Sequence, residues 1–490
     1  MLTGQHQILS SMKRYPLVEE IYTPLSASQC FEIFKDRPFS FFLDSGMDPG
    51  KLGRYSFIGS DPFLVLRSRG EEISLIQGEL TKSRRGNPFD VVGELLALYS
   101  LDGCPAGIPF CGGAVGYFSY DLCHFIERLP STAVDDLNLP ECYLAFYDAV
   151  IAFDHLAGKV YIAATGFPEL EEKKRKRRAA EKLKEMKSQV LNKPSVIEEL
   201  RLVSIEEGIV LKSNFSREEY LEAVKVAREY ICAGDIFQVN LSQRFEADLN
   251  IQPCELYQRL RQINPAPFAS YLGFNDVTVV GASPERFLKV QGDWVETRPV
   301  KGTRPRGKSV SEDKALAQEL LSSVKDRAEN VMIVDLERND IGRVCRYGTV
   351  KVTELAILET YPTVFHLTST VTGRLRPDKN RIDLLKATFP GGSITGAPKV
   401  RAMEIIDELE PTRRSVYTGS IGYLSFSGEM DINIVIRTFL VKGGRVYFQV
   451  GGGIVYDSEP EAEYEETLDK AKALIQALKL SSQVAVEAVS

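Results

Sequence analysis

The chain has 490 residues, of which 44% are hydrophobic and 26% are charged, and its formal net charge is −7. This length predicts about two to three domains, or one large core with a packed extension, and the composition is that of an ordinary globular protein. The negative charge disfavours nucleic acid or a membrane as a partner. No apolar run reaches the roughly 18 residues of a transmembrane helix, and the first residues lack an apolar signal core. We therefore expect a cytoplasmic protein.

Residues 1–165 carry short apolar runs broken by Gly and Pro, such as GRYSFIGSDPFLVL and CYLAFYDAVIAF. Such runs are typical of strands and predict a mostly β N-terminal domain. Residues 166–212 predict a charged helix or linker. Its basic run at 173–178 could bind nucleic acid, but acidic residues precede and follow it, which favours a solvated helix.

The eight cysteines are scattered and form no CxxC pair. A chain of this size does not need disulfides to stabilise its core, so we expect ordinary buried thiols. Cys123 beside His124 would suggest a metal, but Cys104 and Cys111 have the wrong spacing for a zinc site.

Residues 213–478 predict a second domain with alternating helices and strands, and residues 479–490 a tail. A helix is expected from Ser216, a plausible N-cap with Glu219 three residues later, to Gly234. The strand IFQVNLSQRF should follow, with one apolar face and one hydrogen-bonding face. The apolar face consists of Phe237, Val239, Leu241 and Phe245, and the polar face of Gln238, Asn240, Ser242 and Arg244. Further helices are expected at 311–345, 398–409 and 460–478.

The segment TFPGGSITGAPK predicts a glycine-rich turn that leads into the helix at 398–409, with Pro398 at its first position. Ser393, Thr395 and Lys399 would then lie at a helix N-terminus, which favours anions. The segment is not a GxxxxGK[ST] phosphate loop.

In the helix at 460–478, Glu463, Glu466 and Lys470 share one face. A solvated face with a helix ion pair is the alternative. The preceding strand ends in Gly451, Gly452 and Gly453, whose backbone N–H groups a ligand could approach closely. Amide donors beside a carboxylate pair indicate an anionic ligand held partly through a divalent cation, because a hard cation prefers oxygen ligands.

Three isolated residues are also candidates. His366 lies on a predicted strand, where a satisfied structural histidine is the more common alternative. Glu285 follows a proline at a strand turn, and the adjacent Arg286 could simply screen it. Glu329 shares a helix face with apolar residues, a costly position for a carboxylate unless it is paired or metal-bound.

Together these segments resemble the chorismate-utilising enzymes, over about residues 213–475 and more loosely through the N-terminal part. The resemblance implies an α+β fold in which large antiparallel sheets form a sandwich core with helices packed outside. It also implies a magnesium ion between the ring carboxylate of chorismate and the protein, with Glu329 and Glu466 as the matching carboxylates, Glu463 close by and Lys470 in support. Arg437, Tyr417 and the backbone of residues 451–453 match positions that bind the enolpyruvyl carboxylate. Ser393 matches a ring-carboxylate contact, beside Thr395. Glu285 and His366 match acid–base positions near the leaving hydroxyl.

Two positions indicate which reaction the chain catalyses. Relatives that add water carry a Lys where this chain has Gln238, and a neutral amide cannot deprotonate water, so ammonia is the favoured nucleophile. The stretch ETRPVKGTRPRG resembles the aminodeoxychorismate-forming branch, which reads P-I-K-G-T, more than the anthranilate-forming branch, which reads P-I-A-G-T and is the alternative. We hypothesise that the Lys301 amine attacks ring carbon 2. Its pKa must then fall from about 10.4 through burial or a nearby cation such as Arg298, against any nearby carboxylate.

The sequence carries no glutaminase signature, so the resemblance implies that ammonia comes from a separate glutamine amidotransferase subunit in a heterodimer. The segments FFLDSG and NPAPFASYL resemble the two halves of a tryptophan pocket in the anthranilate-forming branch, but they depart from its L-L-E-S and N-P-S-P-Y-M. We therefore do not expect feedback inhibition. Structural tryptophan binding, or a core role alone, are the alternatives. A non-enzymatic binding module is the alternative of another class, and it would turn over no chorismate.

Overall fold

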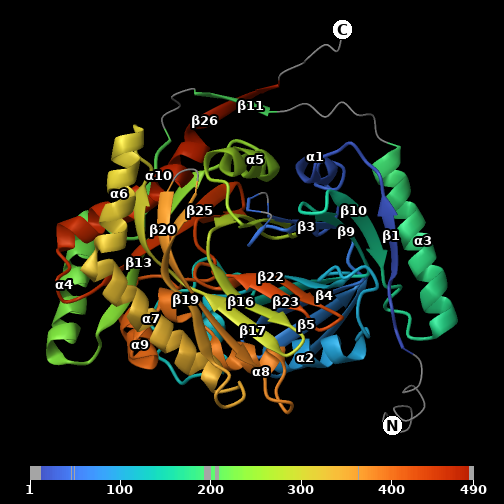
Figure 1. The fold of residues 1–490 in the computed structure, drawn as a ribbon, viewed down its shortest axis with the longest axis horizontal. Helices are drawn as coiled ribbons and strands as arrows, with labels where there is room; N and C mark the ends of the chain where they lie inside the picture. The colour runs from blue at the N-terminus through green and yellow to red at the C-terminus, as the bar shows by residue number, and fades with distance from the viewer. Residues whose placement is uncertain are drawn as a thin grey trace.

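The computed structural model describes residues 13–45, 47–48, 50–192, 200–204, 209–361 and 364–484. These residues form two large, mostly antiparallel sheets with helices packed outside them, as Figure 1 shows. The predicted α+β sandwich is therefore confirmed.

The first sheet has 12 strands and holds the polar strand predicted at 236–245. In spatial order they are β1 (Leu17–Ile21), β10 (Lys159–Ala164), β9 (Ala149–Asp154), β3 (Tyr55–Gly59), β2 (Ser40–Asp44), β14 (Phe268–Gly273), β15 (Thr278–Ser283), β24 (Thr438–Lys442), β25 (Arg445–Ile454), β13 (Gln238–Asp248) and β12 (Lys212–Ser213), with β21 (Gly396–Ala397) also paired to β13.

The second sheet also has 12 strands and holds the loop with Lys301. Its order is β18 (Val300–Pro305), β20 (Val364–Arg374), β17 (Trp294–Arg298), β16 (Arg286–Gln291), β23 (Met430–Asn433), β22 (Ser420–Ser425), β7 (Gly113–Phe118), β8 (Cys142–Tyr147), β4 (Leu64–Arg69), β5 (Glu72–Gln77) and β6 (Leu80–Arg85), with β19 (Lys351–Thr360) also paired to β20. A separate pair joins β11 (Leu200–Ser204) to β26 (Leu480–Val484). Both large sheets combine strands from 1–165 with strands from 213–478, so the predicted boundaries divide the chain but not the sheets.

Strand β2 shows how the core is built. Phe41 and Phe42 are consecutive, and both are fully buried. Because neighbouring strand residues point to opposite faces, Phe41 enters the cluster between the two sheets and Phe42 enters the cluster beneath the helices. The first sheet is therefore covered on both faces.

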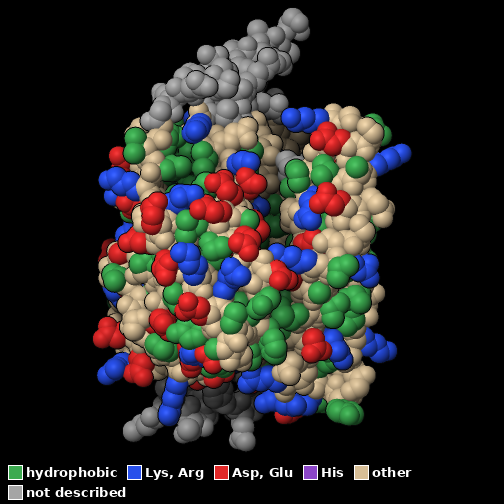
Figure 2. Space-filling view, turned by 90° about the vertical axis from the view of Figure 1, so that its left-hand side faces the viewer, with side chains coloured by type: hydrophobic (Ala, Val, Ile, Leu, Met, Phe, Trp, Pro, Cys, Tyr) green, Lys and Arg blue, Asp and Glu red, His purple; other side chains and the backbone are tan. Residues whose placement is uncertain are grey.

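Ten helices lie in the described part of the chain. They are α1 (Ala27–Phe31), α2 (Pro88–Leu98), α3 (Glu172–Leu191), α4 (Arg217–Ala233), α5 (Pro253–Ile263), α6 (Val310–Ser322), α7 (Val324–Gly342), α8 (Arg381–Thr388), α9 (Lys399–Leu409) and α10 (Pro460–Lys479), with short 3₁₀ turns at Tyr120–Phe125 and Gly392–Ile394. None of them is long and apolar enough to cross a membrane. On the face that carries α4 and α6, acidic and basic side chains are interspersed (Figure 2).

Local signals place most helix ends where the sequence predicts them. The capping box between Ser216 and Glu219 starts α4, and Gly234 ends it with a left-handed φ of 86°. The single helix predicted at 311–345 is wrong, because Ser323 ends α6 and its hydroxyl accepts the N–H of Asp326 to start α7. Pro398 is the N-cap of α9, one residue earlier than predicted.

The polar strand β13 is buried more completely than expected. Val239 and Leu241 are core residues, but Gln238 and Ser242 on the opposite face are buried too. Phe237, predicted to face the core, precedes the strand and is 72% exposed.

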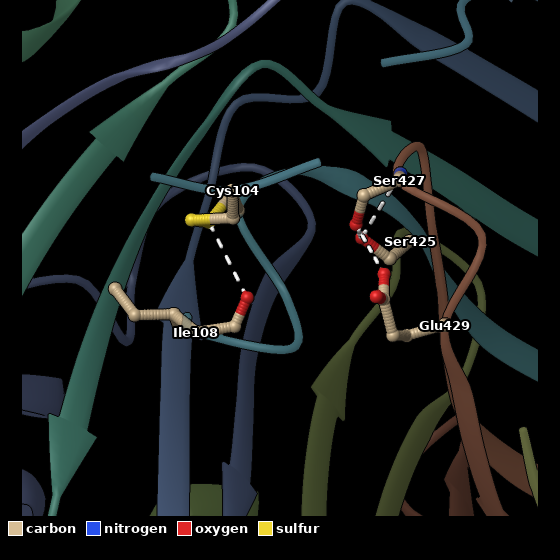
Figure 3. The surroundings of a disulfide bond; sticks show 6 residues. Cys104, Ile108, Ser425, Ser427 and Glu429 are labelled. Carbon is tan, nitrogen blue, oxygen red and sulfur yellow. Dashed lines mark hydrogen bonds between the residues drawn. A yellow bond between two sulfur atoms is a disulfide. The ribbon is translucent and has the colours of Figure 1, made fainter. Parts of the chain in front are cut away.

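The structure corrects the expectation about cysteines, because Cys104 and Cys111 form a disulfide (Figure 3). The bond closes a short loop whose Ile108 is buried in the core between the sheets. The turn after β22 lies beside it, where Phe426 N–H donates to Gly112 O. The other six cysteines are free thiols.

Candidate active site

Lys301 lies where the two sheets meet. It is the second residue of β18, and its Nζ is 3.5 Å from the place where a Cβ on Gly453 would lie. The Gln238 Nε2 atom is only 2.0 Å from the same point. The missing side chain at Gly453 therefore makes room for an amide from β13 and an amine from the other sheet.

The predicted face of α10 lies against Gly451 and Gly452. A Cβ on Gly452 would lie 3.3 Å from Glu463 Oε2, 3.5 Å from Glu466 Oε1 and 3.8 Å from Lys470 Nζ. Lys470 pairs with Glu466 at 2.6 Å and donates to Gly451 O at 2.8 Å. Strand β24 pairs with residues 445–448 of β25, whereas β13 pairs with residues 445–454, so the glycines lie beyond the end of β24. Ligand approach at these glycines stays a prediction.

Charges converge on Lys301 from three elements. Burial lowers the pKa of its amine, and the Lys470 ammonium acts in the same direction. The carboxylates of Glu329, Glu285 and Glu466 act in the opposite direction, but burial outweighs them. The cation that assists burial is thus Lys470, rather than the expected Arg298.

The carboxylates of α7 and α10 influence one another across the site. Burial raises the pKa of Glu329, against the effect of Lys301, and raises the pKa of Glu463, against a hydrogen bond from Ser458 Oγ. Burial also acts on Glu466, but the Lys470 ammonium brings the pKa of Glu466 below its ordinary value.

Glu285 is buried in the turn between β15 and β16. It accepts a hydrogen bond of 2.6 Å from Ser393 Oγ and one of 3.4 Å from the Val300 N–H. Burial raises the pKa of Glu285 to about 7, although Ser393 and Lys301 both lower it. A carboxyl group with this pKa both gives and takes a proton near neutrality, as acid–base catalysis requires.

His366 is buried on β20, and its Nδ1 lies 2.9 Å from Thr303 Oγ1. Burial, assisted by the nearby Arg437 guanidinium, lowers the pKa of its imidazole to about 4. The imidazole is therefore neutral at physiological pH.

Arg437 lies beside the backbone of Lys470 and close to Tyr417. Arg437 has a left-handed φ of 53°, which is unusual for a residue other than glycine, and its Nη1 donates to Lys470 O. Burial lowers the pKa of Arg437, and the Tyr417 hydroxyl lies close enough to oppose this shift. Burial raises the pKa of Tyr417.

Two side chains of the predicted anion site at α9 make hydrogen bonds within the protein. Lys399 pairs with Asp340 and donates to the carbonyls of Thr388 and Pro390. The Thr395 hydroxyl donates to Gly391 O at 3.0 Å, so it stabilises the glycine turn. A substrate contact from Thr395 stays a prediction.

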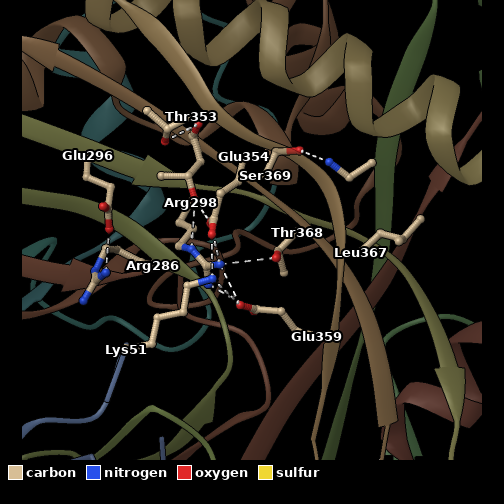
Figure 4. A network of polar contacts seen from close by, with 12 residues as sticks. Lys51, Arg286, Glu296, Arg298, Thr353, Glu354, Glu359, Leu367, Thr368 and Ser369 are labelled. Carbon is tan, nitrogen blue, oxygen red and sulfur yellow. Dashed lines mark hydrogen bonds and ion pairs between the residues drawn. The ribbon is translucent and has the colours of Figure 1, made fainter. Parts of the chain in front are cut away.

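The arginines beside Lys301 are all paired. Arg298 is buried and binds Glu354 at 3.1 Å and Glu359 at 2.6 Å, and Lys51 binds the same two carboxylates (Figure 4). Two further arginines of the loop pair with helix carboxylates, Arg304 with Glu319 and Asp326, and Arg306 with Asp313. The basic loop is therefore a structural network around one lysine whose amine faces the site.

Two carboxylates near the site were missed by sequence reasoning. Asp326 precedes Glu329 by three residues, the spacing of Glu463 and Glu466, and this repeated pattern could have revealed it. Its Oδ1 is 3.2 Å from the place where a Cβ on Gly302 would lie. Glu337 is buried on α7 and contacts the glycine turn, and no local pattern indicated this.

The predicted metal ligands are near one another but do not form a closed cluster. In the described ranges, no group of three or more His, Cys, Asp or Glu side chains is close enough to hold a metal. Instead, the Lys301 amine lies close enough to Glu329 and Glu466 to affect their pKa values, and the Lys470 ammonium affects those of Glu463 and Glu466. These oxygen donors nevertheless fit a hard divalent cation in kind, because Glu466 raises the pKa of both Glu329 and Glu463, and carboxylates this close to one another favour a shared positive charge.

The two segments that resemble a tryptophan pocket line a second cavity of about 300 Å³, apart from the site of Lys301. Asp44 and Ser45 come from one segment, and Phe268, Ala269 and Ser270 from the other. The segments are therefore not core alone.

Comparisons with known proteins agree on the family of this chain. A sequence model of the chorismate-binding enzymes matches residues 48–476. Anthranilate synthase component 1 of Acetivibrio thermocellus is 41% identical over 477 residues, which cover 96% of each chain. Aminodeoxychorismate synthase component 1 of Bacillus subtilis (strain 168) is 39% identical over 438 residues, which cover 89% of this chain and 92% of that protein. The crystal structure of anthranilate synthase component I from Streptococcus pneumoniae TIGR4 has a TM-score of 0.74 at 33% identity, and covers 87% of this chain and 93% of that one. Relatives of two different activities thus match nearly the whole chain at similar identity.

Proposed function

Because the chain belongs to the chorismate-binding enzyme family, we propose that it is component I of an aminodeoxychorismate synthase, which replaces the carbon-4 hydroxyl of chorismate by ammonia. The observation that carries the proposal is the place of Lys301, whose amine lies beside Gln238 and Gly453 with its pKa lowered by burial. An uncharged amine at this point is a nucleophile that an alanine could not supply.

The reaction takes place in two displacements. The neutral Lys301 amine forms a bond to ring carbon 2, the two ring double bonds shift, and the carbon-4 C–O bond breaks. Glu285 gives its proton to the departing hydroxyl, which leaves as water. Ammonia then forms a bond to carbon 4, the double bonds shift back, and Lys301 leaves carbon 2 as a neutral amine. The new ammonium group returns the proton to Glu285, so chorismate and ammonia give 4-amino-4-deoxychorismate and water.

Glu285 is the acid in this scheme, and His366 supports it. A pKa of about 7 leaves Glu285 partly protonated at neutral pH, whereas a pKa of about 4 leaves His366 without a proton to give. The neutral imidazole instead keeps Thr303 in place on the strand of Lys301.

Binding residues surround this centre. Arg437 and Tyr417 bind the enolpyruvyl carboxylate together with backbone N–H groups of residues 451–453. Ser393 contacts the ring carboxylate. Glu329, Glu463 and Glu466 would hold a magnesium ion, with support from Lys470. When bound, magnesium withdraws electrons through the ring carboxylate and favours attack at carbon 2.

The relatives named component 1 support a two-component enzyme. We propose that ammonia comes from a glutamine amidotransferase subunit bound as a heterodimer, and that the product leads toward 4-aminobenzoate and folate. Gln238 contributes by leaving no base to activate water, so ammonia is the nucleophile.

A second candidate is anthranilate synthase component I, which the similarity to the Acetivibrio thermocellus and Streptococcus pneumoniae proteins favours. The two candidates differ in product, because anthranilate is fluorescent and aromatic and 4-amino-4-deoxychorismate is not.

The test is product identification by chromatography and mass spectrometry with chorismate, ammonium and magnesium, and with glutamine plus an amidotransferase subunit. We expect 4-amino-4-deoxychorismate from the wild type and from Lys308→Ala, an exposed lysine of the same loop, but not from Lys301→Ala. Without ammonium, Lys301 should gain the mass of chorismate less one water. Anthranilate from the wild type would refute the proposed activity, and wild-type rates in Lys301→Ala would refute the covalent step.

A further inference from the structure

Glu337 is a buried carboxylate that the proposed chemistry does not use. It lies on α7, two turns beyond Glu329, and is 2% exposed. Its Oε1 accepts the N–H of Gly392 at 3.0 Å, and its Oε2 accepts the hydroxyl of Thr297 at 3.3 Å. The carboxylate thus joins α7 to the glycine turn and to strand β17.

The glycine turn is seated closely on α7 at this point. A Cβ on Gly392 would lie 2.6 Å from Leu336 Cδ2 and 3.1 Å from Glu337 Oε1. The next residue of the turn is Ser393, whose hydroxyl donates to Glu285 at 2.6 Å. The position of this hydroxyl therefore depends on where Gly392 is held.

We propose that Glu337 is a positioning residue that holds the Gly392 N–H and thereby keeps the Ser393 hydroxyl on the Glu285 carboxyl. As far as activity is concerned, this inference rests on the proposed function, in which Glu285 is the acid. The contact itself does not depend on which product the enzyme forms.

The charges around the two carboxyl groups agree with this role. Glu337 faces Asp340 on its own helix, Lys399 of α9 and Glu285 across the turn, and burial raises the pKa of Glu337 to about 7. Glu285 faces Lys301 of β18 and the Ser393 hydroxyl, and both lower its pKa. Glu337 has no cation in direct contact among the described residues, so its oxygens are available as hydrogen-bond acceptors for the turn.

The test compares Glu337→Met, which keeps the volume and removes both acceptors, with Glu337→Gln, whose amide oxygen still accepts the Gly392 N–H. In Glu337→Met, the Ser393 hydroxyl should leave Glu285. Loss of one hydrogen bond to a charged group is worth about a tenfold change in proton affinity. The alkaline limb of the kcat profile should therefore move up by roughly one pH unit, because the acid keeps its proton to higher pH. Glu337→Gln should show no upward shift, because it keeps the acceptor for the Gly392 N–H and only removes a negative charge that faces Glu285.

Two controls separate positioning from general damage. Val334→Ala removes core packing from the same helix and removes no hydrogen bond to the turn, so it should lower the melting temperature and leave the alkaline limb of the kcat profile unchanged. Ser393→Ala should show the same upward shift as Glu337→Met, and the double variant should show no further shift. If Glu337→Met does not fold, Glu337→Asp withdraws the carboxylate by one methylene and should shift the limb in the same direction.

A crystal structure of Glu337→Met tests the inference without turnover. We expect Ser393 Oγ beyond hydrogen-bond distance of Glu285. An unchanged contact, an unchanged pH limb in Glu337→Met, or an equal shift in Val334→Ala would overturn the proposal. If the wild type forms no product from chorismate, the proposed function fails and the crystal structure alone decides this inference.

Discussion

Replacing each of the three glycines before α10 by alanine should give three different defects. None of them has a left-handed φ, so the backbone itself accepts a methyl group. What differs is the group that the new Cβ meets.

The contact distances set the order of the effects. At Gly451 the Cβ would lie 2.6 Å from Leu241 O and 2.7 Å from Ser242 Cβ, on a paired strand that cannot shift alone. Such overpacking costs about 1–3 kcal/mol of folding free energy. At Gly453 the Cβ would lie 2.0 Å from Gln238 Nε2, the end of a side chain, which must retreat by about 1.4 Å to reach ordinary contact.

The consequences for the site differ accordingly. A displacement of about 1 Å in an active site lowers the rate about 10²-fold, so Gly453→Ala should lose about that factor in kcat/KM while it melts nearly like the wild type. Gly452→Ala places a methyl group 3.3 Å from Glu463 Oε2, so it should fold normally and need more magnesium for half-maximal activity.

The assays are thermal unfolding, kcat/KM for chorismate, and activity against magnesium concentration, measured on all three variants. Gly451→Ala should have the lowest melting temperature and Gly453→Ala the lowest kcat/KM at a temperature where all are folded. The reverse order, or wild-type kcat/KM in Gly453→Ala, would show that Gln238 does not occupy the space above Gly453.

Three further predictions concern stability. Arg414→Met should lower the free energy of unfolding, measured by urea denaturation, by about 3–5 kcal/mol. The reason is that Glu410 would remain as a buried charge without its partner at 2.7 Å. Adding Glu410→Gln should restore part of the lost stability. The His366 pKa of about 4 lies below its ordinary 6.5, so the unfolded chain binds more protons at this residue between these pH values. Up to about 3 kcal/mol of stability is therefore lost as pH falls from 6.5 to 4. Urea titrations should show a smaller fall of stability with pH in His366→Asn, and an equal fall would contradict the prediction. Dithiothreitol should destabilise the wild type by about 2.5 kcal/mol through the Cys104–Cys111 loop but leave Cys104→Ser unchanged, and an equal effect on both would argue against the disulfide.

Much of the local structure was predictable from the sequence because its causes are local. Ser216 and Glu219 cap the helix that they begin, and Gly234 ends it, since each acts within one turn of the backbone. Glu463, Glu466 and Lys470 share a helix face by spacing alone, and the structure places that face on the glycines.

The errors have long-range or purely geometric causes. The helix predicted at 311–345 breaks at Ser323, whose hydroxyl caps the start of α7. A serine in the sequence is compatible both with a helix interior and with an N-cap, so its identity alone does not locate the break. Phe237 has the alternation of a core residue, but β13 begins one residue later. The pairing of Cys104 with Cys111 depends on how the loop between them folds against the core.

The sequence by itself determined which chemical groups the site contains: a lysine, acidic pairs, an arginine and glycines that leave space. Only the tertiary structure decided which of these groups are neighbours and how their pKa values shift. Lys301 meets Gln238 because strands of two different sheets converge, and Glu285 meets Ser393 across 108 residues of chain. Burial then moves the pKa of the Lys301 amine down and that of the Glu285 carboxyl up. No residue type encodes that shift, because desolvation is a property of everything packed around the group.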